Sequence, residues 1–102
     1  MIHVIATIHL ARGRRAEFLS HFHALVPLVH AEKGCLDYGP AIDMHTPVTS
    51  EPPVRDDVVT VIERWESVQA LQDHLAATHM DRYRQTVKDL VVGVEIRVLQ
   101  PA

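Results

Sequence analysis

The sequence predicts a single α+β domain with β-strands at both ends and amphipathic helices between them. Its 47% hydrophobic and 23% charged residues are typical of a globular protein rather than a disordered chain. Apolar side chains alternate with a two-residue period in several segments, which predicts strands, and recur with helical spacing in others. A chain of 102 residues has room for one core, so we expect one domain over residues 1–102.

The N-terminal third predicts one strand and one helix. Ile2 to Leu10 is rich in β-branched residues and alternates between two faces, which indicates a strand. Gly13 breaks it, and a helical stripe follows that ends before Gly34, formed by Phe18, Phe22, Leu25, Val26 and Val29. Pro27 lies inside this helix, where it removes a backbone hydrogen bond, so we expect a kink there.

Two further strands flank a long connection. Cys35 to Asp43 is expected to be the second strand and Val58 to Glu66 the third, because Val59, Val61, Glu63 and Trp65 alternate with polar and apolar partners. Residues 44–57 contain three prolines and many polar residues, which predicts a loop. A loop of this length is typically either a functional lid or a linker, and both readings stay open.

The C-terminal third predicts two helices and a last strand. Ser67 is placed to cap a helix, and Thr78 with Asp81 resembles a second capping signal that restarts the helix in a new direction. The apolar stripes are Val68, Leu71 and Leu75, then Met80, Tyr83, Val87 and Leu90. Gly93 is expected to end the second helix before a strand from Val94 to Leu99.

The resulting order is βαββααβ, for which a ferredoxin-like antiparallel sheet with its helices on one face is the expected solution. The other face of the sheet carries Ile5, Val58, Thr60 and Ile62. This face is too apolar to remain in water as a contiguous surface. We therefore expect a homodimer in which two sheets pack face to face.

Charge and cysteine content exclude several classes of protein. A net charge of −3 offers no basic face for nucleic acid. Cys35 is the only cysteine, so neither an internal disulfide nor a CxxC zinc site is expected, and a reducing compartment fits best. The apolar N-terminus is interrupted by polar residues and is not expected to be a signal peptide, and no apolar run is long enough for a membrane helix. The expected location is the cytoplasm.

Eight histidines suggest metal binding, but their spacing does not. His21 and His23 face different directions on a helix, and His74 and His79 are five residues apart across the predicted helix break. We therefore expect no metal site. Three arginines at the start of the first helix, Arg12, Arg14 and Arg15, oppose the helix dipole and are read as a solvated charge cluster or as an anion site.

A candidate pocket lies where the third strand meets the helix that follows it. Glu63 and Trp65 share one strand face, and that helix is expected to lay His74 over the same face. A histidine base beside an aromatic wall suits proton removal from a flat, apolar substrate. A buried glutamate in this position requires a partner.

The residues of this junction resemble the antibiotic biosynthesis monooxygenase (ABM) family. The matching positions are Ile62-Glu63-Arg64-Trp65-Glu66-Ser67, Ala70-Leu71, His74-Leu75, His79-Met80 and Tyr83. Other segments resemble the quinol monooxygenase branch of that family, namely Val4-Ile5-Ala6, Gly13, Pro27, Lys33-Gly34-Cys35, Tyr38-Gly39-Pro40 and Ile96-Arg97-Val98-Leu99-Gln100-Pro101.

The resemblance implies a homodimeric α+β barrel and an oxygenase that uses O2 without a flavin, haem or metal group. A quinol or related phenolic aromatic molecule would be the substrate and would itself reduce oxygen. His74 is then the general base or proton relay and Trp65 the aromatic wall, while Glu63, His79 and Tyr83 hold the substrate hydroxyls. Haem-degrading and polyketide-tailoring relatives carry asparagines where this chain has Ala6 and Val61, which argues against their substrates.

Two other functions remain open. ABM relatives that isomerise a small phosphorylated signalling molecule use a similar histidine, and the cluster of Arg12, Arg14 and Arg15 would suit a phosphate. The third possibility is a non-catalytic dimer that binds a quinone as a stress protein without converting it.

Overall fold

The computed structural model describes residues 1–48 and 52–102. Its elements, in order, are β1 (Ile2–Leu10), α1 (Arg15–His30), β2 (Cys35–Ala41), β3 (Val58–Trp65), α2 (Val68–Leu75), α3 (Thr78–Val87) and β4 (Val91–Leu99). The predicted order βαββααβ is therefore confirmed. No helix in the described ranges is both long and apolar enough to span a membrane.

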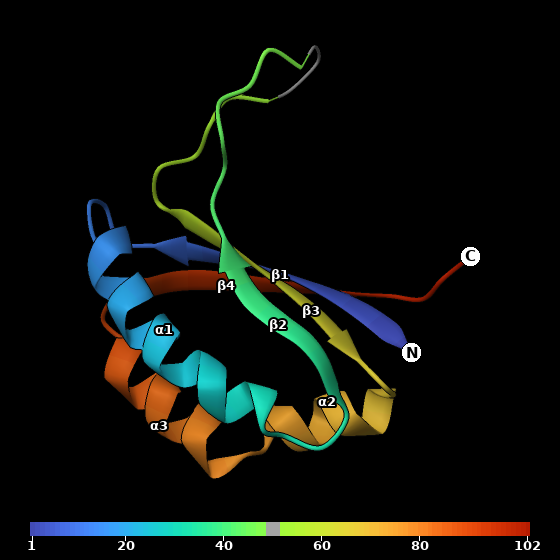
Figure 1. Ribbon diagram of the computed structural model, residues 1–102. Helices are drawn as coiled ribbons and strands as arrows, with labels where there is room; N and C mark the ends of the chain where they lie inside the picture. Colours follow the sequence, from blue (N-terminus) through green and yellow to red (C-terminus); the bar gives the residue numbers. More distant parts are fainter. Residues whose placement is uncertain (49–51) are drawn as a thin grey trace.

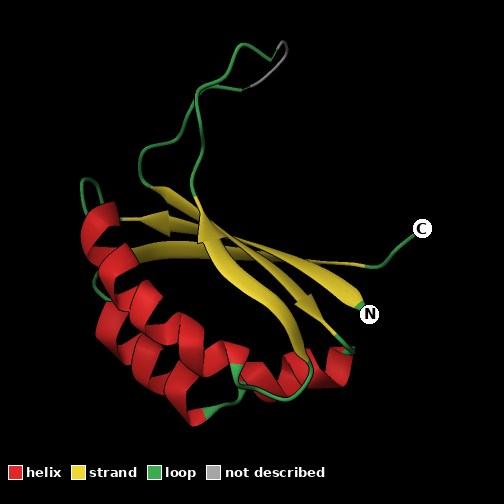
Figure 2. Cartoon of the chain, in the orientation of Figure 1, coloured by secondary structure: helices red, strands yellow, loops and turns green. Residues whose placement is uncertain are grey.

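The strands form one four-stranded antiparallel sheet in the order β2-β3-β1-β4. The helices all lie on one side of this sheet (Figures 1 and 2), which is the predicted ferredoxin-like arrangement. β1 and β3 occupy the centre, paired from Ile2 with Trp65 to His9 with Val58. β4 is an edge strand.

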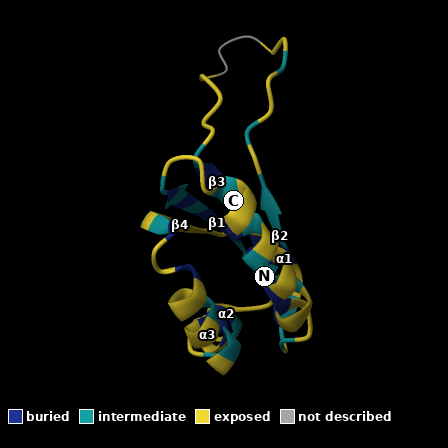
Figure 3. Cartoon of the chain, turned by 90° about the vertical axis from the view of Figure 1, so that its left-hand side faces the viewer, coloured by how far each residue is buried: buried dark blue, intermediate teal, exposed yellow. Residues whose placement is uncertain are grey.

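The core lies between the sheet and the helices. The helix-side residues of the central strands are buried, and α1 adds Phe18 and Phe22, which are almost wholly enclosed at 0% and 1% exposed. Phe22 stacks on Tyr38 of β2 with ring centroids 5.6 Å apart. In Figure 3 the buried residues lie between the two layers and the outer helix surfaces are exposed.

The edge strand β4 is covered less completely than the rest of the sheet. Val94 pairs with Ile8 and Ile96 pairs with Ala6, so these β4 residues share the helix side of the sheet. They nevertheless remain 53% and 51% exposed, whereas Ile8 and Ala6 are buried. The helices therefore leave an open space beneath β4.

Several predicted boundaries were wrong. β2 ends at Ala41 rather than at Asp43, and β3 ends at Trp65 rather than at Glu66. Gly93 does not end a helix, because α3 ends at Val87 and Gly93 lies inside β4, opposite His9. Pairing with β1 overrides the weak strand propensity of glycine at this position.

The two capping predictions had different outcomes. The Ser67 side chain accepts a hydrogen bond from the Ala70 amide at 3.1 Å, so the predicted cap of α2 is confirmed. The break before α3 is also confirmed, but Thr78 is not its cap. Ala77 precedes α3 in an extended conformation and makes no side-chain cap bond. α1 continues from Arg15 through Pro27 to His30.

The connection between β2 and β3 spans residues 42–57, and the predicted loop is confirmed for its described parts; residues 49–51 of it lie outside the described residues. Those described parts extend away from α2 and α3 (Figure 1). Arg55 donates two side-chain hydrogen bonds to Asp43, at 2.8 and 3.0 Å, and thereby joins the two ends of the loop. This pairing lowers the pKa of Asp43 to about 2.

Candidate active site

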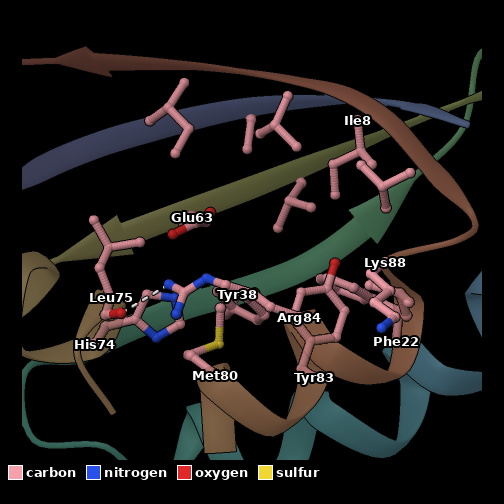
Figure 4. A pocket seen from close by; sticks show the side chains of 16 residues that line it. Ile8, Phe22, Tyr38, Glu63, His74, Leu75, Met80, Tyr83, Arg84 and Lys88 are labelled. Atoms are coloured by element: carbon pink, nitrogen blue, oxygen red, sulfur yellow. Dashed lines mark hydrogen bonds between the residues drawn. The ribbon is translucent and has the colours of Figure 1, made fainter.

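The space beneath β4 is a cavity of about 410 Å³ between the sheet and α3 (Figure 4). This volume lies in the range of roughly 300 to 1,000 Å³ that is typical of small-molecule sites. Its apolar lining comes from Ala6, Ile8, Phe22, Val61, Leu75, Met80, Val87, Val91, Val94 and Ile96. Its polar lining is limited to Tyr38, Glu63, His74, Tyr83, Arg84 and Lys88. The cavity therefore suits a flat, mainly apolar molecule with a few polar groups.

Glu63 enters the cavity from the central strand β3. It is 6% exposed, and its Oε1 accepts a hydrogen bond from the Trp65 indole nitrogen at 2.9 Å. Trp65 is thus the partner that a buried glutamate requires. Burial raises the pKa of Glu63 to about 7; the nearby charge of Glu32 adds to this and the Trp65 bond opposes it. Glu63 can therefore hold or release a proton near neutral pH.

Trp65 supports the cavity from behind rather than lining it. Its side chain is wholly buried and is not among the lining residues. The indole ring packs on the His74 ring with centroids 4.7 Å apart. We therefore place Trp65 as the residue that fixes Glu63 and His74, whereas the sequence reading had assigned it to the substrate-facing wall.

His74 lies on α2 and lines the cavity with its side chain 2% exposed. Its Nδ1 lies 2.8 Å from Oε2 of Glu32. No buried side-chain nitrogen or oxygen of the described residues lacks a hydrogen-bond partner, so Nε2 is the ring nitrogen that reaches the open cavity. Burial lowers the pKa of His74, while the bond to Glu32 opposes the shift. The ring is thus held neutral, with Nε2 available as a base.

Tyr83 is half-buried on α3 and lines the same cavity, while its contact with substrate stays a prediction. Burial raises its pKa, so the hydroxyl keeps its proton and can donate a hydrogen bond. Tyr38 of β2 also lines the cavity, and burial next to Glu63 raises its pKa as well. The sequence reading missed Tyr38, although strand alternation places it opposite Glu63 on the helix side.

His79 occupies a different place from the one expected. Its Nε2 lies 2.7 Å from Oε2 of Glu32, and its side chain lines a second, shallower pocket rather than the main cavity. His74 and His79 thus meet at Glu32, a residue that the sequence did not single out. The turn at Ala76 and Ala77 between α2 and α3 allows this approach.

Glu32, His74 and His79 are also the residues that could hold a metal ion, since their ligand atoms all lie within 4.8 Å of one another. The two contacts of 2.7 and 2.8 Å are typical of hydrogen bonds. Ligands about 2.0 to 2.1 Å from a tetrahedral zinc ion would lie roughly 3.3 Å apart. The observed spacing fits the hydrogen-bonded cluster better than a set of metal ligands.

The arginine cluster at the start of α1 does not reach the cavity. Arg14 pairs with Glu17 at 2.6 Å, and Arg15 donates to the backbone carbonyl of Arg55. Neither residue, nor Arg12, lines the cavity. The cationic residues at the cavity are instead Arg84 and Lys88, and Arg84 donates to the Leu75 carbonyl at 2.7 Å (Figure 4).

Comparison with known proteins places this architecture in a family. Residues 1–86 match the family model described as antibiotic biosynthesis monooxygenase. The chain is 39% identical over 103 residues to a protein of Escherichia coli K12 named "Probable quinol monooxygenase YgiN", with 99% of this chain and 98% of that protein covered. The crystal structure of PA3566 from Pseudomonas aeruginosa is 29% identical, with a TM-score of 0.82 over 99% of this chain and 93% of that one.

A third relative shows the fold alone. The structure of Rv0793 from Mycobacterium tuberculosis is 24% identical with a TM-score of 0.78, covering 99% of this chain and 94% of that chain. Both solved structures match almost the whole of this chain, and the sequence relative covers it to the same extent. The chain belongs to the antibiotic biosynthesis monooxygenase family.

Proposed function

We propose that the chain is a cofactor-independent monooxygenase that oxidises a quinol or a related phenolic aromatic molecule with O2. The observation that carries this proposal is the His74 Nε2 atom, which faces an apolar cavity together with Glu63 and Tyr83. The family and the name of the Escherichia coli relative support the same reaction class.

The proposed reaction balances without a prosthetic group. Removal of a hydroxyl proton by His74 makes the ring electron-rich enough to reduce O2. One oxygen atom then enters the ring and the other leaves as water, so a dihydroxy aromatic and O2 give a hydroxylated quinone and water. All the electrons come from the substrate, and the protein supplies a base, orientation and hydrogen-bond donors.

The first proton transfer, from the substrate hydroxyl to His74, is unfavourable in free energy. This explains why hydrogen-bond donors line the cavity. A phenol of pKa about 10 facing an imidazole of pKa about 6.5 leaves a deficit of roughly 5 kcal/mol. The lowered pKa of His74 increases this deficit, although it keeps the ring free to accept a proton. Hydroxyl donors at Tyr38 and Tyr83, and Glu63 while it is protonated, would stabilise the phenolate in this mainly apolar cavity.

Oxygen uptake tests this function directly. Wild-type protein should consume O2 above the autoxidation rate with at least one member of a panel of hydroquinones and naphthohydroquinones, and isotopically labelled O2 should appear in the product. Labelled peroxide with unlabelled product would indicate an oxidase, and stoichiometric quinone binding without uptake would indicate a binding protein. Either result would overturn the proposal.

We also propose that the chain functions as a homodimer. Ile5 pairs with Ile62 on the face of the sheet opposite the helices, and Ile62 is 48% exposed there. Val58, predicted on this face, is already buried within the chain. Packing of a second sheet on this face would remove the apolar surface from water. A light-scattering mass equal to one chain at micromolar concentration would contradict a dimer.

A further inference from the structure

Once substrate fills the cavity, Nε2 of the proposed base loses its direct route to solvent. The His74 side chain is 2% exposed, and the cavity that its Nε2 faces is mainly apolar. A base that takes a proton from substrate must pass it on before it can act again, and the reduced oxygen later requires a proton in return. The ring nitrogen that points away from the cavity, Nδ1, is the only other site of exchange on this side chain.

Nδ1 of His74 leads to a chain of short hydrogen bonds. Oε2 of Glu32 lies 2.8 Å from Nδ1 of His74 and 2.7 Å from Nε2 of His79. A single carboxylate oxygen thus bridges two imidazole rings, with its side chain 13% exposed. Both distances lie within the roughly 2.6 to 3.2 Å between heavy atoms that is required for proton transfer to a base.

The far end of this chain opens on another face of the molecule. His79 is 23% exposed in its side chain and lines a second pocket of about 220 Å³, together with His21, Leu28 and Arg82. Tyr83 lines both pockets and so stands between them. The cluster of Glu32, His74 and His79 therefore connects the main cavity with a separate, solvent-accessible pocket.

We propose that Glu32 and His79 form a proton relay that links His74 in the cavity to solvent at the second pocket. This inference rests on the proposed function. Before transfer, the Nδ1–H of His74 donates to Oε2 of Glu32, and the protonated Oε2 donates to the unprotonated Nε2 of His79. The substrate proton binds Nε2 of His74, the Nδ1 proton moves to Oε2 of Glu32, the original Glu32 proton moves to Nε2 of His79, and Nδ1 of His79 releases its own proton to water. The phenolate keeps the electron pair. The relay runs in reverse when the reduced oxygen takes up a proton, which restores the starting tautomers.

The relay differs from a purely structural cluster in a way that can be measured. Neither Glu32 nor His79 lines the main cavity, so their loss should leave substrate binding unchanged. Glu32→Gln keeps the size of the side chain but removes the bridging carboxylate. His79→Ala interrupts the relay at its solvent end and leaves room for a small proton carrier. His21→Ala is the matched control, because it removes a histidine from the same pocket.

Steady-state kinetics is the first test. Glu32→Gln and His79→Ala should each lower kcat about tenfold or more with little change in KM, since a positioned proton donor or acceptor contributes roughly 10² to 10⁴ in rate. Added imidazole should restore the His79→Ala rate in a concentration-dependent way and should have no effect on His21→Ala. An unchanged kcat in both variants, or a loss with raised KM and no rescue, would overturn the relay.

A second test does not depend on activity. NMR should detect a strongly hydrogen-bonded Nδ1 proton of His74 in wild-type protein, exchanging with water through His79. This exchange should slow in His79→Ala, recover with imidazole, and be unchanged in His21→Ala. If wild-type protein oxidises no quinol, the proposed function fails and the exchange data still decide the relay. If exchange is identical in all variants, the relay fails while the proposed function can stand.

Discussion

Glu32 and Glu63 flank the same histidine and have different surroundings. Glu63 is buried in the sheet side of the cavity, with an indole N–H as its hydrogen-bond donor and a pKa raised to about 7. Glu32 lies outside the cavity lining, and its Oε2 is within hydrogen-bond distance of two imidazole rings. One carboxyl group can therefore keep a proton next to substrate, whereas the other connects two groups that exchange protons. The difference comes from position in the fold rather than from residue type.

The backbone explains how each glutamate is held. Glu63 sits in the middle of β3, where pairing with Val4 and Tyr38 on both sides fixes its direction. Glu32 lies in the short turn after α1, which is held by Gly34. The Gly34 carbonyl accepts from the Glu66 amide at 2.9 Å, and its φ of +86° is favourable only for glycine. A strand therefore positions one glutamate and a tight turn positions the other.

Removal of His74 should have the largest effect, because both glutamates act around this side chain. His74→Ala should lower kcat for quinol oxidation about a hundredfold, within the range of roughly 10² to 10⁴ for a positioned base. Oxygen uptake under saturating substrate measures it. His23→Ala, which removes an exposed histidine on α1, is the control and should retain the parental rate. A His74→Ala rate equal to the parental rate would show that the base lies elsewhere.

Glu63→Gln should test the carboxyl group that lines the cavity, through its effect on stability at different pH values. The folded-state pKa of about 7 exceeds the ordinary 4.5, so the protonated carboxyl stabilises the fold below about pH 4.5 and this contribution is lost as pH rises through 7. The glutamine has no such proton. Between pH 5 and pH 8 the wild-type free energy of unfolding should fall relative to the variant by roughly 3 kcal/mol.

Urea unfolding of both proteins at several pH values measures this difference. Glu66→Gln, at an exposed position just after β3, serves as the control and should follow the wild-type curve. Parallel pH profiles for wild type and Glu63→Gln would mean that Glu63 ionises as it does in the unfolded chain.

Gly34→Ala should disturb the turn that carries Glu32 and not the strand that carries Glu63. An added Cβ would lie 2.6 Å from the Cβ of Ala70 on α2, and the positive φ is unfavourable for alanine. These effects together should lower the free energy of unfolding by roughly 2 kcal/mol and displace the turn that carries Glu32. Gly39→Ala is the matched control, since no atom lies within 4 Å of its added Cβ. Equal denaturation midpoints for the two variants would contradict this account.

Ser67→Ala should have the smallest effect. The serine caps α2, the helix that places His74 between the two glutamates. Loss of the cap should reduce the free energy of unfolding by about 1 kcal/mol. Thermal unfolding measures the change, and Ser20→Ala at an exposed position of α1 is the comparison. If the Ser67 and Ser20 variants have the same Tm, the cap contributes nothing measurable to stability.

Local patterns predicted much of the fold and part of the site. Alternation along β3 put Glu63 and Trp65 on one face, and the capping serine located α2 and hence His74. The start of β4 was missed because its ladder with β1 extends past Gly93, and pairing between distant segments is not visible in local spacing.

Glu32 was missed for a related reason. It is 42 residues from His74 in the sequence, and no periodicity marks a polar residue at the end of a helix. Gly34 was the available signal, because a glycine next to a helix end often marks a tight turn that packs closely on another element. Trp65 was expected at the cavity surface, but the sequence could not show that Tyr38 and His74 would cover it.

Because the helices cover β4 incompletely, two residues that shape the cavity contribute little to the stability of the fold. Val94 and Ile96 form part of the cavity wall while remaining about half exposed, so they contribute less to the core than the buried residues opposite them. Substitutions at these two positions can change the width and polarity of the cavity with little loss of stability, because surface positions tolerate change better than packed interiors do. The edge strand thus gives this scaffold a way to acquire new substrates during evolution while its proton-handling residues stay in place.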